Sequence, residues 1–217
     1  MNGHVLADAI AYFLITASCI CLRTWAQAKM ADWRGDLAPR AEGRLSMNPM
    51  VHYDEIGTVF IPLLSIALSG LGTDFSSIRP PVFGWGRQLN LNHPDPKKMG
   101  AHEMAIVGAA LGMNLLLACI FSAVGALFGG AFPSVGQLCQ IAIHVNVGLF
   151  VFHLLPIPPL DGAVFLKHLS GISEEAYTTY CQYSIWVFLG LMFLTPVGKG
   201  VSLLIFWFEL PFQLFMR

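Results

Sequence analysis

The sequence predicts an all-α polytopic membrane protein, and two observations lead to this prediction. First, 55% of the 217 residues are hydrophobic and only 12% are charged, whereas soluble domains carry about 25% charged residues. Second, the apolar residues gather in runs long enough to form helices that cross a lipid bilayer. We therefore expect the lipid bilayer as a partner, while a net charge of -1 gives no indication of nucleic-acid binding.

Residues 1–217 are expected to form a single membrane domain with about five spanning helices and one re-entrant segment. The expected elements are a first helix over 5–27, a re-entrant segment or short span over 57–72, helices over 104–132 and 135–155, and two final helices over 177–195 and 200–215. The segment 57–72 contains Pro62 and is short for a span, and the loop after it is again basic, so we favour the hairpin. Small β segments are expected in the cytoplasmic loops, between Arg40 and Pro96.

Basic residues orient the first helix. No Lys or Arg precedes it, whereas the stretch that follows carries Lys29, Arg34, Arg40 and Arg44. Because cytoplasmic loops of membrane proteins are enriched in such residues, we expect the N-terminus outside and the C-terminus in the cytoplasm.

The residue that most needs an explanation is Asp161, in the run HLLPIPPLDG over 153–162. A carboxylate at membrane depth is costly unless a cation, a metal or hydrogen-bond donors meet it, so Asp161 marks a candidate site. In the expected topology the first helix reaches the same membrane face near Arg23. We expect the two side chains to pair, and the other possibility is that Arg23 extends to the lipid interface.

Three segments together resemble a known family. They are LLPIPPLDG over 154–162, GRLSMNPMVHYDEIGT over 43–58, and FGWG over 83–86. These segments are similar to the site-2 proteases, the M50 family of intramembrane zinc metalloproteases, and to its small bacterial branch without a PDZ domain. The resemblance extends over more than half of the chain, and it implies an integral protein of the bacterial inner membrane.

The resemblance also shows what this sequence lacks. The family places an HExxH motif on its first core helix and takes a third zinc ligand from the aspartate that corresponds to Asp161. Here the motif is replaced by 23–27, RTWAQ. Arg23 stands in place of the first histidine, Thr24 in place of the general base and Gln27 in place of the second histidine. We therefore expect no catalytic residue, and loss of the zinc that the family binds.

Three further polar residues are expected at a groove for a substrate or partner. His153 stands where the family has an asparagine thought to position substrate, and Asn114 matches the asparagine of the family's GPxxN motif, without its proline. Asn146 lies within the helix over 135–155, where hydrogen bonding between helices is the usual role of an asparagine.

Two hypotheses of function follow from these residues. The first is a catalytically inactive site-2-protease-like protein that binds a membrane protein, as a regulator or as a subunit of a membrane complex. The second is an active zinc-dependent protease with a rearranged metal site drawn from Asp161, His153 and His52. A transporter or channel is disfavoured, because polar residues do not line up across several helices.

Overall fold

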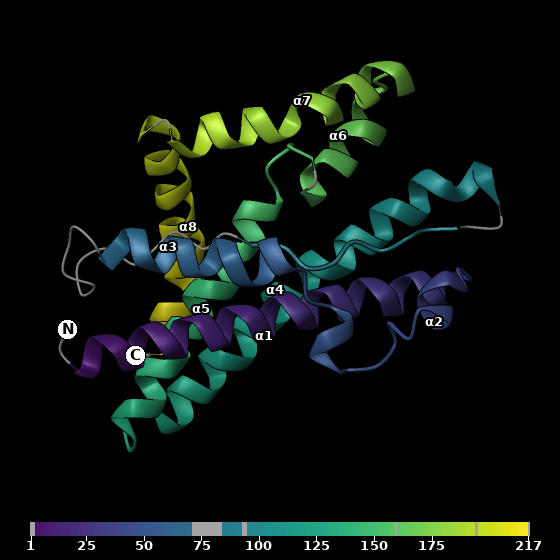
Figure 1. The fold of residues 1–217 in the computed structure, drawn as a ribbon. Coiled ribbons are helices and arrows are strands. Elements are labelled where there is room, and N and C mark those ends of the chain that lie inside the picture. Colours follow the sequence, from purple (N-terminus) through teal and green to yellow (C-terminus); the bar gives the residue numbers. More distant parts are fainter. Residues whose placement is uncertain (1–2, 71–83, 93–94, 159, 194, 217) are drawn as a thin grey trace.

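The computed structural model describes residues 3–70, 84–92, 95–158, 160–193 and 195–216 (Figure 1). Its helices are, in chain order, α1 (Gly3–Trp33), α2 (Ala38–Ala41), the 3-10 helix η1 (Pro49–Val51), the π-helix η2 (Glu55–Phe60), α3 (Ile61–Gly70), the 3-10 helix η3 (Pro96–Lys98), α4 (Met99–Phe128), α5 (Pro133–His153), α6 (Asp161–Ser170), α7 (Glu174–Phe193) and α8 (Thr195–Phe215). The expected all-α class is confirmed, because the described part of the chain contains helices and no strand.

Three helices of the described residues are long and apolar enough to cross a membrane. They are α1 over Leu6–Trp33, α4 over Met99–Phe128 and α5 over Pro133–His153. Two shorter apolar helices, Glu55–Ala67 and Gly200–Phe215, accompany them. The protein is therefore an integral membrane protein. The region expected to form the last two spans folds as α7 and α8, neither of which meets the same criterion over its described residues.

Helix α5 lies at the centre of the bundle. Its eight consecutive residues 142–149 are all buried, as is typical of a helix covered on every side. Apolar side chains of α1, including Ile20, pack against Val145 and Leu149 of α5. Another face of α5 contacts α4 and α8, through a cluster that includes Val147, Ala118 and Ile205. In Figure 1, α7 lies apart from α1, and α8 leads back from α7 towards the other helices.

The segment expected to re-enter the membrane is helical in its described part. Asp54 caps η2, because its carboxylate accepts hydrogen bonds from the backbone N–H groups of Ile56 and Gly57. The π-helix continues directly into α3, so Pro62 lies inside a continuous helix and leaves a carbonyl group of the preceding turn without a helical donor. The carbonyl oxygen of Gly57, five residues earlier, accepts a hydrogen bond from Trp85 N. The remaining part of the expected segment, residues 71 and 72, lies outside the described residues.

The small β segments expected between Arg40 and Pro96 are not found in the described residues of that stretch, so this prediction is wrong there. Capping side chains start helical turns instead, as Asn48 does for η1. Residues 84–92 have no regular secondary structure. Their backbone donates two hydrogen bonds to the preceding segment, from Trp85 N to Gly57 O (3.2 Å) and from Arg87 N to His52 O (2.9 Å). A ladder does not form, because the acceptors belong to helical turns.

Candidate functional site

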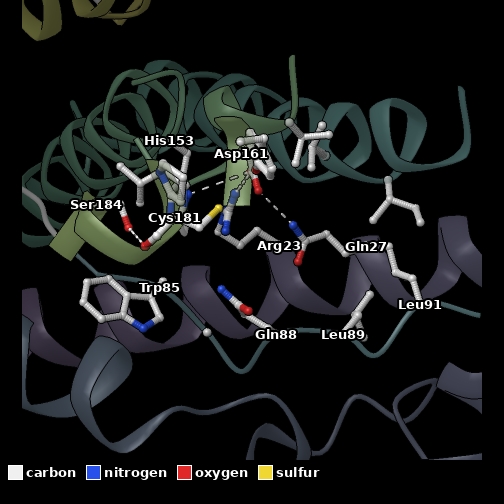
Figure 2. Close-up of a pocket in the computed structure, with 17 residues that line it drawn as sticks. Arg23, Gln27, Trp85, Gln88, Leu89, Leu91, His153, Asp161, Cys181 and Ser184 are labelled. Carbon is white, nitrogen blue, oxygen red and sulfur yellow. Dashed lines mark hydrogen bonds and ion pairs between the residues drawn. The ribbon is translucent and has the colours of Figure 1, made fainter. Parts of the chain in front are cut away.

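A buried ion pair joins α1 to the start of α6. The guanidinium Nη2 of Arg23 donates a hydrogen bond to Oδ2 of Asp161, and the two side chains are only 3% and 8% exposed. The second carboxylate oxygen, Oδ1, accepts a hydrogen bond from Nε2 of Gln27 at 3.2 Å. Figure 2 shows both α1 side chains directed at Asp161. The acid therefore has a charged partner and a neutral donor.

The proline-rich turn places Asp161 at this point. Helix α5 ends at His153, and Leu160 is in an extended conformation just before α6 begins. Asp161 is thus the first residue of a helix, where a negative charge is favourable. A side chain at Gly162 would collide with the backbone carbonyl groups of Leu154 and Leu155. Glycine is therefore required after the aspartate, because the chain folds back closely on the turn.

His153 connects this site to the segment 84–92. Its Nε2 lies 3.0 Å from the carbonyl oxygen of Gly84, and a carbonyl can only accept, so Nε2 carries the proton. The other ring nitrogen, Nδ1, lies 3.9 Å from Oδ2 of Asp161. In the neutral ring this Nδ1 is an acceptor. His153 therefore positions the segment and adds no donor to the carboxylate.

The remaining predicted residues lie elsewhere. Thr24 donates its hydroxyl to the carbonyl oxygen of Ile20 at 2.6 Å, within its own helix. Asn146 donates to the carbonyl oxygen of Ala142 at 2.8 Å and contacts the sulfur of Cys19 on α1 at 3.2 Å. Asn114 is fully buried on α4, and its side chain makes no hydrogen bond within the described residues.

A cavity of about 420 Å³ opens beside the ion pair. Of the three residues expected at a groove, the structure places only His153 in its wall. Sequence reasoning missed several lining residues, which come from α7 and from the segment 84–92: Tyr177, Cys181, Ser184, Trp85, Gln88, Leu89 and Leu91. The α7 residues follow a spacing of i, i+4 and i+7, which places them on one helical face. This row of polar side chains on one helical face is the signal in the sequence that could have identified the α7 residues as part of the cavity.

The residues present do not fit a zinc ion. Both oxygens of Asp161 already accept hydrogen bonds, and a dication beside them would face the permanent positive charge of Arg23. Within the described part of the chain, no three His, Cys, Asp or Glu side chains converge to form a metal site. His52, the third member of the rearranged set, is buried in a loop, where its Nε2 lies 2.7 Å from the carbonyl oxygen of Ser46.

Comparisons with known proteins find relatives of this chain. It is 32% identical over 185 residues to the Bacillus subtilis protein named "Putative zinc metalloprotease YwhC", a match that covers 81% of this chain and 76% of the relative. It is 30% identical over 206 residues to the protein named "Putative zinc metalloprotease Rip2" from Mycobacterium tuberculosis, which covers 90% and 70%. The Rip2 protein of Mycolicibacterium smegmatis is 27% identical over 200 residues. No family model matches the chain, and no solved structure matches it significantly.

The first prediction concerns the ion pair. Asp161→Asn leaves the buried guanidinium of Arg23 without its counter-charge, so we expect a loss of about 3–5 kcal/mol of stability. An Arg23→Met, Asp161→Asn double variant should recover much of this loss, because neither buried charge remains. Thermal unfolding of the purified protein in detergent measures both effects. The exposed pair of Lys98 and Asp95 supplies the control, since Asp95→Asn should hardly change the melting temperature. Purely additive losses would contradict the pairing.

The second prediction concerns the loop that holds His52. Burial lowers the pKa of His52 below its ordinary value, and the nearby charge of Arg44 lowers it further. As the pH falls through about 6.5, the unfolded chain takes up a proton that the folded chain resists, so stability should decrease. His52→Gln can still donate to Ser46 but does not titrate. Its melting temperature should therefore fall less than that of the unaltered protein between about pH 7.5 and about pH 5.5. An unchanged pH dependence in this variant would contradict the assignment.

Proposed function

The chain belongs to the site-2-protease-like family of zinc metalloproteases, and from this premise we propose that it is a catalytically inactive member, a pseudoprotease. It would bind a membrane protein in place of cutting it, as a regulator or as a subunit of a membrane complex. The small bacterial branch without a PDZ domain is the part of the family to which we assign it. The proposed location is the bacterial inner membrane, with the N-terminus outside and the C-terminus in the cytoplasm.

The observation that carries this proposal is the contact of Arg23 with Asp161. Arginine stays charged at every relevant pH, so it balances the buried carboxylate permanently. It cannot activate a water molecule as a metal ion does. Thr24, at the position proposed for the general base, donates its hydroxyl to its own helix and has no acid–base function near neutral pH. Arg23 thus replaces the metal as the positive charge beside Asp161, but it does not replace the metal in activating a water molecule.

The proposed partner site is the cavity beside this pair together with the segment 84–92. The cavity is lined by amide, hydroxyl and thiol groups as well as apolar side chains, so it suits a partially polar stretch of chain. Gln88 lines it and is exposed. These features support the binding of a membrane-spanning segment of a client next to α1, without the groups that would cleave it.

The third prediction tests inactivity through the metal. The triple variant Arg23→His, Thr24→Glu, Gln27→His restores the family motif, and we expect it to bind about one zinc ion per chain, with Asp161 as the third protein ligand. The same variant with Asp161→Ala should lose this zinc. The unaltered protein should bind no stoichiometric zinc and cleave no membrane substrate. Metal analysis of the purified protein gives the answer, and stoichiometric zinc in the unaltered protein that disappears with Asp161→Ala would favour the rearranged active protease.

The fourth prediction tests partner binding. A photo-crosslinking amino acid at Gln88 should form a defined adduct with one membrane protein in native membranes. The same group at Phe132, which is exposed in the α4–α5 connection, should give no such adduct. Purification followed by mass spectrometry identifies the adduct. The same set of adducts from both positions would show that the cavity does not select a partner.

A further inference from the structure

We propose that a second site, a groove between α1 and α4, binds one anionic phospholipid. The groove has a volume of about 590 Å³ and shares no lining residue with the cavity beside Asp161. Both of its walls are membrane-spanning helices, so it opens towards lipid. This inference does not depend on the loss of catalysis.

The floor of the groove is apolar, and its α4 side is exposed at Gly112 and Leu116. Ala26 and Met30 of α1 lie four residues apart and therefore on one helical face, opposite Ala109 and Gly112 of α4. A methyl group added at Gly112 would meet no atom within 4 Å, so a ligand can approach the backbone there. Leu116, which continues this wall, is 53% exposed. This part of the groove suits an acyl chain.

Beside the apolar floor, a second row of α1 residues has a different character. Trp25, Lys29 and Trp33 follow one another at intervals of four residues and lie along the groove. The ammonium group of Lys29 lies 5.6 Å from the centre of the Trp25 ring, and the indole N–H of Trp25 is held by the carbonyl oxygen of Leu45 at 3.1 Å. Tryptophan and lysine are the residues that gather at the headgroup level of a bilayer. The position of Lys29 in this row therefore suits a phosphate group.

One carboxylate also lines the groove, but its charge is already balanced. Asp32 accepts hydrogen bonds from Nε and Nη2 of Arg40, one at each oxygen and each at 3.0 Å. Lys29 also attracts Asp32 electrostatically, but two cations, Lys29 and Arg40, face this one carboxylate, and the remaining positive charge can attract an anionic ligand. A ligand with an apolar chain and a single negative head matches the apolar floor and the row that contains Lys29, and basic residues at the cytoplasmic membrane surface attract anionic lipids. We therefore assign the groove to an anionic phospholipid rather than to a helix of a partner.

The fifth prediction tests the headgroup. Native mass spectrometry of the full-length protein should show more phosphatidylglycerol than phosphatidylcholine retained when the two carry identical acyl chains. Lys29→Gln should reduce phosphatidylglycerol retention about fivefold and leave phosphatidylcholine unchanged. Lys98→Gln is the matched control, because Lys98 pairs with Asp95 away from the groove. Equal retention of the two lipids by the unaltered protein, or equal losses in the two lysine variants, would overturn the proposal.

Further variants test the acyl chain and the carboxylate in the same assay. Gly112→Leu should fill the groove and reduce retention of both lipids, whereas Ala126→Leu, on an exposed position of α4 outside the groove, should not. Arg40→Gln should weaken phosphatidylglycerol binding by releasing the charge of Asp32, and adding Asp32→Asn should restore it. Unchanged lipid retention in Gly112→Leu would overturn the proposal.

Discussion

The need to balance one buried carboxylate organises the site. Asp161 begins α6 at the end of a proline-rich turn, and its charge is met by Arg23 from α1. The same neighbourhood includes His153, which holds the carbonyl group of Gly84. One acid therefore brings together segments that are far apart in the sequence. Because an isolated charge at this depth is costly, the positions of these segments depend on one another.

In the proposed pseudoprotease, arginine takes the electrostatic place of a metal ion beside Asp161. A zinc ion and a guanidinium both neutralise a carboxylate, so either one can satisfy the buried acid. They differ in what else they do, because only the metal polarises a water molecule and offers an open coordination position. The planar guanidinium occupies the space next to Asp161 and leaves no such position.

Much of this could be predicted from the sequence, because the decisive residues are unusual for their surroundings. Asp161 and Arg23 stand out within apolar runs, and prolines mark where α5 ends. The helix class follows from composition and from the lengths of the apolar runs. The prediction of β segments between Arg40 and Pro96 is wrong in the described residues of that stretch. The local sequence pattern there is typical of an extended chain, but the side chains of Asn48 and Asp54 cap helical turns. Periodicity also does not tell which helix faces which, so the contribution of α7 to the cavity was missed.

The contact of α5 with α8 is another helix pairing that the sequence pattern does not reveal. The buried carboxylate of Glu209 on α8 lies 3.0 Å from Nδ1 of the buried His144 and also accepts a hydrogen bond from Gln213 at 2.7 Å. Its partner is 65 residues away in the chain, and such a distance leaves no local pattern. The central helix α5 thus carries a paired histidine in its middle and ends at the turn that presents Asp161. In a membrane, apolar packing alone discriminates weakly between helix faces. The two buried acids Asp161 and Glu209 each pair with a residue from another helix, and these pairs therefore help to specify how α1, α6 and α8 are arranged around α5.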